Sequence, residues 1–110
     1  MAKGHYPAEF ELYVLAALVH LGDDAYGMTV RQTIEARSGR AVSIGAVYTT
    51  LERLQDKGYV TFRVSDPRPV PGGRARKYIR LTPRGRRVFD DATAMLLRML
   101  PSPAMAGPRR

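Results

Sequence analysis

The chain has 110 residues, of which 18 are lysine or arginine and 10 are aspartate or glutamate, so its net charge at neutral pH is +8. This length predicts one small domain and excludes a large enzyme with several sites. Because cysteine is absent and the two histidines, His5 and His20, lack a convincing carboxylate constellation, we expect neither an enzyme nor a metal or cofactor. The longest apolar stretch, residues 12–21, is too short to span a bilayer, so we expect a cytoplasmic protein with no membrane partner.

Three helices are expected in the first half of the chain. Apolar residues spread over positions 8–21 predict the first. Asp23 and Asp24 are expected to cap a second helix, from about Ala25 to Arg37, and Ser43 to cap a third, from about Ile44 to Lys57. A glycine marks the expected end of each helix, at Gly22, Gly39 and Gly58.

The third expected helix has two different faces. One is an apolar line that suits a protein core, formed by Ile44, Val47, Leu51 and Leu54. The residues off that line are small or carry hydroxyl groups, with one cation: Gly45, Ala46, Tyr48, Thr49, Thr50 and Arg53. Side chains this short would let a helix sink between the phosphate ridges of a duplex, so we expect this face to meet the major groove.

A β-hairpin is expected next, because residues 59–64 and 77–81 alternate in polarity. The intervening segment 65–73 holds three prolines and two glycines and is predicted to be a loop. Residues 63–87 carry nine basic side chains and one acidic, which accounts for the whole charge excess. We expect Arg74, Arg76 and Lys77 to contact DNA phosphates or a minor groove. The alternative is a solvated basic face.

A last helix is predicted from Pro83, capped by Thr82, to about Leu100, followed by a disordered tail over residues 101–110. Its apolar side chains form two adjoining lines: Val88, Ala92, Met95 and Met99, and Phe89, Leu96 and Leu100. One line suffices to pack on so small a domain, so we expect the other to form a homodimer. The alternative is that all seven side chains pack within one chain.

This order of elements is that of a winged helix-turn-helix, a mainly α fold with a two-stranded β-hairpin (α+β). We expect a DNA-binding domain over residues 8–82 and a dimerisation helix over 83–100, with double-stranded DNA as the partner. The predicted function is a sequence-specific transcriptional regulator. The alternative is a non-specific architectural DNA- or RNA-binding protein, because affinity for phosphate does not distinguish duplex DNA from RNA.

Three blocks of the sequence, Ser43–Leu54, Lys57–Val60 and Gly73–Gly85, resemble the PadR family of bacterial transcriptional regulators, and the resemblance covers residues 9 to about 90. It implies a dimeric repressor of a palindromic operator, with Ser43, Gly45, Tyr48 and the basic wing residues on DNA and the first and last helices in the dimer contact. Some members bind small-molecule effectors at the dimer interface, although no residue here identifies one.

The chain departs from the family pattern at three places. Thr49 and Asp23 stand where the family often has proline, and Tyr26-Gly27-Met28 stands where it has His-Gly-Tyr. The last departure puts in doubt any DNA contact by the tyrosine of that motif, and all three are expected to shift operator preference.

Overall fold

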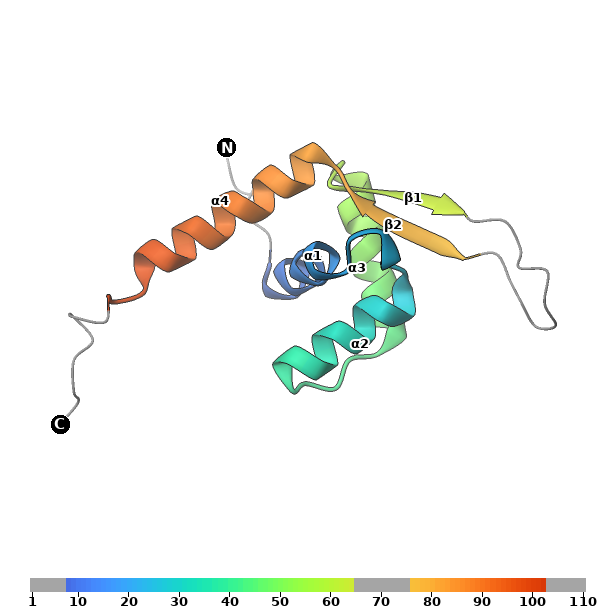
Figure 1. Ribbon diagram of the computed structural model, residues 1–110, viewed down its shortest axis with the longest axis horizontal. Helices are drawn as coiled ribbons and strands as arrows, with labels where there is room; N and C mark the ends of the chain where they lie inside the picture. The colour runs from blue at the N-terminus through green and yellow to red at the C-terminus, as the bar shows by residue number, and fades with distance from the viewer. Residues whose placement is uncertain (1–7, 65–75, 103–110) are drawn as a thin grey trace.

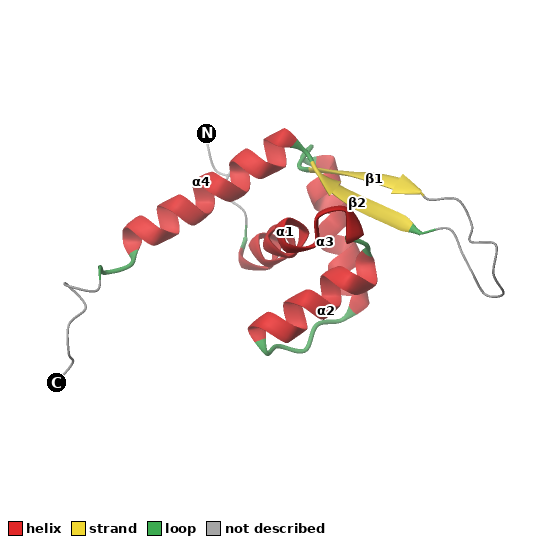
Figure 2. Cartoon of the chain, viewed as in Figure 1, coloured by secondary structure: helices red, strands yellow, loops and turns green. Residues whose placement is uncertain are grey.

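The structure is a computed structural model, described for residues 8–64 and 76–102, which have a winged helix-turn-helix architecture (Figures 1 and 2). The described elements follow in this order: α1 (Glu9–Leu21), the 3-10 turn η1 (Gly22–Asp24), α2 (Gly27–Ser38), α3 (Ile44–Asp56), β1 (Val60–Val64), β2 (Lys77–Leu81) and α4 (Pro83–Met99). The predicted order of helices and strands is confirmed. None of the described helices is long and apolar enough to cross a membrane.

Helices α1, α2 and α3 pack around one apolar core, which the base of the hairpin closes. Its fully or nearly fully buried side chains come from every one of these elements and include Val14, Leu15, Leu18, Val30, Ile34, Val47, Leu51, Leu54, Val60 and Ile79. Strands β1 and β2 pair antiparallel, with Val60 opposite Leu81 and Val64 opposite Lys77. The hairpin therefore projects from one side of the bundle, and α4 projects from the other (Figure 1).

Helix ends follow the predicted signals in α3 and α4. The Ser43 hydroxyl accepts a hydrogen bond from the Ala46 N–H (3.0 Å), and the Thr82 hydroxyl accepts one from the Gly85 N–H (3.0 Å), with Pro83 in the first turn. The glycines predicted to end the first three helices, Gly22, Gly39 and Gly58, have φ angles of 57°, 74° and 81°. Residues with a Cβ atom rarely adopt such angles.

The predicted start of the second helix is wrong. Helix α2 begins at Gly27 instead of Ala25, and Asp23 and Asp24 form the turn η1 without capping α2. The reason lies in the hairpin: the Ile79 N–H donates to the Ala25 carbonyl (2.8 Å), and Tyr26 forms a β-bridge with Tyr78. Residues 25 and 26 are thus held extended against β2, and the helix starts only after them.

Candidate nucleic-acid interface

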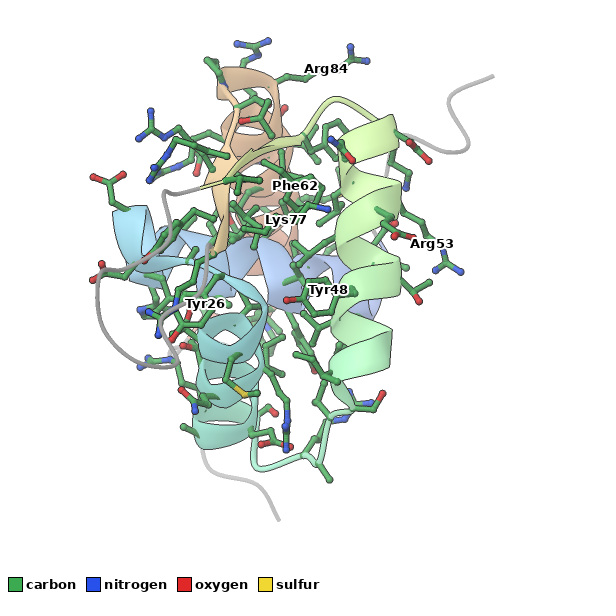
Figure 3. All side chains as sticks on the ribbon, turned by 90° about the vertical axis from the view of Figure 1, so that its right-hand side faces the viewer. Tyr26, Tyr48, Arg53, Phe62, Lys77 and Arg84 are labelled. Atoms are coloured by element: carbon green, nitrogen blue, oxygen red, sulfur yellow. The ribbon has the colours of Figure 1, made fainter. Side chains whose placement is uncertain are left out.

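The first half of α3 presents small, uncharged side chains to solvent. Gly45, Ala46 and Thr49 are exposed, and Tyr48 is 39% exposed. The Tyr48 phenol leaves α3 on the side facing α2, whereas Arg53 leaves the helix on the opposite side, near its far end (Figure 3). The exposed acidic residues of this helix, Glu52 and Asp56, also lie in its second half. The exposed residues from Ser43 to Thr49 therefore include no acidic side chain.

The expected DNA contact by Thr50 is wrong, because this side chain is only 5% exposed. Thr50 lies three residues after Val47 and four before Leu54, which are both fully buried. At 100° per residue, the arc of a helix that faces a core is wider than a single line of apolar residues. Thr50 falls within that arc and is therefore buried.

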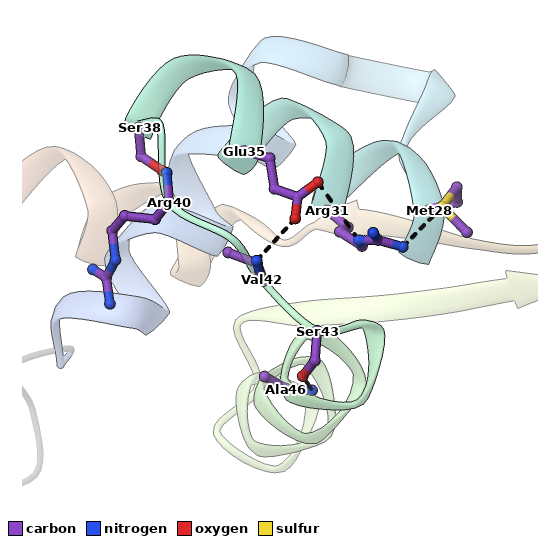
Figure 4. A network of polar contacts seen from close by, with 8 residues as sticks. All are labelled: Met28, Arg31, Glu35, Ser38, Arg40, Val42, Ser43 and Ala46. Carbon is purple, nitrogen blue, oxygen red and sulfur yellow. Dashed lines mark hydrogen bonds and ion pairs between the residues drawn. The ribbon is translucent and has the colours of Figure 1, made fainter.

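The turn between α2 and α3 is held by polar contacts that orient the start of α3 (Figure 4). The Glu35 carboxylate accepts a hydrogen bond from the Val42 N–H (2.9 Å) and lies 3.7 Å from the Arg31 guanidinium. The Ser43 hydroxyl is committed to its cap on Ala46. Ser43 is exposed and at the predicted interface, but its first structural role is to begin the helix.

Two of the three predicted wing cations, Arg76 and Lys77, lie in the described part of the chain, at the start of β2. Lys77 is exposed, and its ammonium lies 4.4 Å from the centre of the Phe62 ring. Lys77 lies two positions before the buried Ile79, so both extend from the face of the hairpin that meets the core, and Figure 3 shows Lys77 on the same side of the molecule as Tyr48. Arg76 is half-buried, with its guanidinium 4.5 Å from the centre of the Tyr26 ring. Arg74 and the predicted loop 65–73 lie outside the described residues.

Sequence reasoning missed an aromatic contact between the hairpin and α2. The rings of Tyr26 and Tyr78 meet edge to face, with centres 5.7 Å apart and planes at 80°. The Arg63 guanidinium lies 5.1 Å from the centre of the Tyr78 ring. Tyr26 falls within the predicted second helix, and nothing local in the sequence distinguishes a helical position from a bridge to a strand more than 50 positions later.

Several other basic side chains of the 63–87 segment form ion pairs with acidic residues or lie far from Tyr48. Arg80 pairs with Asp23 (3.3 Å) and Arg86 with Asp90 (3.0 Å), both on the exposed surface. Arg84 lies at the start of α4, far from Tyr48 in Figure 3. For these residues the solvated basic face is the better description.

A buried ion pair that the sequence analysis did not predict fixes α3 against α1. The Lys57 ammonium lies 2.9 Å from the Glu11 carboxylate, whose side chain is only 7% exposed. Glu11 also accepts a hydrogen bond from the Ala8 N–H (3.1 Å) at the start of α1. Glu11 lies in α1, and Lys57 directly follows α3, 46 positions later in the sequence. The pair therefore holds α3, the helix that carries Tyr48, against α1.

The apolar residues of α4 are packed on the core near its start and exposed near its end. Val88 and Phe89, near its start, pack against the core, and Ala92 is half-buried. Beyond them five large apolar side chains are between 39% and 77% exposed: Met95, Leu96, Leu97, Met99 and Leu100. The alternative in which all seven predicted residues pack within one chain is therefore wrong for four of them. Leu97 lies off both predicted lines and was missed.

A cavity of about 340 Å³ opens between α1 and α2, away from the hairpin. Its floor is apolar, formed by Ala16, Ala17 and Ile34, and Arg37 and Arg40 lie on its rim. Arg40 is hydrogen-bonded to Glu9 (3.2 Å), which raises the pKa of its guanidinium. Among the described residues, no three His, Asp or Glu side chains converge as metal ligands would.

Comparisons with known proteins agree with this architecture. Residues 14–91 match the Transcriptional regulator PadR-like family. A search of curated proteins found no match. A PadR family transcription regulator from Clostridium difficile R20291 is similar in structure, with a TM-score of 0.68 at 21% identity over 84% of this chain and 91% of that one.

Two further solved structures share the fold. PadR from Bacillus subtilis, in complex with operator DNA, has a TM-score of 0.65 at 21% identity, over 87% of this chain and 51% of that one. The PcaV transcriptional regulator from Streptomyces coelicolor, in complex with its natural ligand, has a TM-score of 0.67 at 22% identity, over 84% and 57%. The family match spans most of the chain and coincides with the winged helix-turn-helix described above, and this chain belongs to the PadR-like family of transcriptional regulators.

Proposed function

We propose that this protein is a dimeric, sequence-specific repressor that binds a palindromic operator through α3 and the basic hairpin. The observation that carries the proposal is the exposed, uncharged first half of α3. A major groove is about 12 Å wide and admits a helix whose outward side chains are short. Gly45, Ala46 and Thr49 meet that requirement, and Tyr48 adds a hydroxyl that can bond a base edge or a phosphate.

The charge distribution supports the same orientation. No acidic side chain lies between Ser43 and Thr49, whereas Lys77 faces the same side as Tyr48. A cation beside the recognition helix neutralises flanking phosphates and releases counterions, which adds affinity without sequence preference. The helix would therefore supply specificity and the hairpin affinity.

The end of α4 supports a dimer. Five large apolar side chains exposed within one short segment, residues 95–100, are unusual on a monomer and suit a self-complementary interface. A twofold dimer would present two copies of α3 to successive major grooves, about 34 Å apart on one side of the duplex. The expected operator is then a palindrome. Bacillus subtilis PadR, which shares the fold, was solved with operator DNA, and this supports DNA as the ligand.

The test is selection of bound fragments from the source genome, followed by competition. A regulator should prefer its selected site over random DNA by at least about a thousandfold. Comparable affinity for the selected site, random DNA and duplex RNA would instead identify the architectural alternative. Repression is then tested by placing the selected site before a reporter gene, whose expression should fall when the protein is present.

Substitutions in α3 test whether this helix reads the DNA sequence. Tyr48→Ala and Thr49→Ala are expected to weaken binding to the selected site without unfolding the domain, while the affinity for random DNA stays nearly unchanged. Gln32→Ala, at an exposed position of α2, is the matched control and should alter neither affinity. Equal losses on both kinds of DNA would remove α3 from sequence readout.

The cavity between α1 and α2 is the candidate site for an effector. Its volume of about 340 Å³ lies at the lower end of ligand pockets, and its apolar floor and cationic rim suit a small aromatic anion. Benzoate is a suitable probe: it should raise the thermal unfolding midpoint of the parent protein, and Ala16→Phe, which fills the floor, should abolish the shift. A shift that survives this substitution would place benzoate elsewhere.

A further inference from the structure

The start of α2 touches both elements proposed to contact DNA. Gly27, its first residue, is buried, and a Cβ built there would overlap the Tyr48 phenol and lie 2.8 Å from its Cε2. Gly27 does not have a positive φ angle, unlike the three glycines that end helices. Its backbone therefore does not require glycine. A side chain at this position would need the space that the end of the Tyr48 ring occupies, so the ring would have to move away.

The preceding residue supports the hairpin. Tyr26 has an extended backbone (φ −146°, ψ 172°) and bridges to Tyr78 of β2, next to the 2.8 Å hydrogen bond from the Ile79 N–H to the Ala25 carbonyl. Its ring meets the Tyr78 ring edge to face and receives the Arg76 guanidinium at 4.5 Å. Tyr26 thus fixes both the backbone of β2 and the first described cation of the wing.

We infer that Tyr26 and Gly27 form a joint that sets the position of the Tyr48 ring relative to the Arg76 guanidinium. Consecutive Cα atoms are 3.8 Å apart, so two supports on adjacent residues cannot shift independently. The recognition helix and the wing are thereby held at one spacing before DNA arrives, which lowers the ordering cost of binding. This inference rests on the proposed function, and it makes Tyr26 and Gly27 positioning residues that need not touch DNA.

The first test is a double-mutant cycle between Gly27 and Tyr48, read by unfolding and by DNA binding. In the parent background, Gly27→Ala should displace the Tyr48 ring and reduce affinity for the selected site at least about tenfold, the range expected for a displaced base contact. Affinity for random DNA should stay within about twofold, because non-specific binding depends on phosphate neutralisation. In a Tyr48→Ala background the same substitution should change the unfolding midpoint more favourably than it does in the parent, since the ring it would displace is gone.

Gly45→Ala is the matched control for the unfolding measurement, because a Cβ there has open space around it, and it should not lower the midpoint in either background. The contact is refuted if Gly27→Ala changes the midpoint equally with and without the Tyr48 ring. The positioning role is refuted if the parent protein prefers its selected site and Gly27→Ala retains that preference.

The second test concerns Tyr26 and the wing. Tyr26→Phe keeps the ring and should bind the selected site like the parent, whereas Tyr26→Leu should weaken binding by roughly two- to fivefold, the scale of one cation–π contact. Removing Arg76 should then cost less in the Tyr26→Leu background than in the parent. Independent effects of Tyr26→Leu and Arg76→Ala would refute the coupling. If the parent protein had no preferred site, the proposed function itself would be refuted. The unfolding cycle at Gly27 would still test the contact with Tyr48, because that measurement uses no DNA.

Discussion

The ion pair between Glu11 and Lys57 offers the sharpest test of how α3 is held. Lys57→Met would leave the Glu11 carboxylate, 7% exposed, with the Ala8 N–H at 3.1 Å as its only partner among the described residues. Breaking a fully buried pair costs about 3–5 kcal/mol and an exposed one about 0–1 kcal/mol. Because the Lys57 side chain is 35% exposed, we expect a loss of about 2 kcal/mol, between these limits.

For a domain of this size that loss lowers the thermal midpoint by about 8–16 °C, measured by circular dichroism. Replacing both charges, with Glu11→Gln and Lys57→Met together, should restore part of the stability, because no unpaired charge is then buried. Arg86→Met is the matched control, since it breaks the exposed pair with Asp90 and should cost no more than about 0.5 kcal/mol. Equal midpoints for Lys57→Met and Arg86→Met would refute the reasoning.

Three further outcomes are expected. Gly85→Ala should destabilise the fold by at least about 1 kcal/mol in urea, because its Cβ would overlap the backbone carbonyl of Tyr59, whereas Gly45→Ala, with open space around it, should stabilise α3 by up to about 1 kcal/mol. Leu97→Glu should give monomers by sedimentation if the end of α4 forms the dimer; unchanged dimers would place the interface elsewhere. Replacing Arg76 and Lys77 by serine should weaken all DNA alike and reduce the slope of log K against log salt by about 2 per protomer, and an unchanged slope would remove them from the interface.

Local signals were sufficient where the structure depends on neighbouring residues. The Ser43 and Thr82 caps and the glycine stops act within a few positions, so the sequence alone predicted where α3 and α4 begin and where three helices end. The alternation in β2 likewise needed no tertiary information, and Lys77–Leu81 was predicted with its observed bounds.

What the sequence could not show depends on distant partners or on the width of a buried face. Tyr26 is extended because it bridges to Tyr78, and Glu11 is buried because Lys57 reaches it, and neither partner can be identified by periodicity. Thr50 was assigned to the exposed face because it lies off the apolar line, although the buried arc of the helix is wide enough to include it. Tyr48 was predicted to contact DNA, but its contact with Gly27 emerges only when α2 and α3 are packed.

Photo-crosslinking from the exposed face of α3 tests the central claim most directly. A photoreactive phenylalanine analogue at position 49 should crosslink to bases of the selected site, at two places about 10 base pairs apart, one for each half-site. The same analogue at position 32, on the exposed surface of α2, should give no base crosslinks. Crosslinking at position 49 that is no stronger than at position 32, with DNA bound in both cases, would show that α3 does not read the duplex.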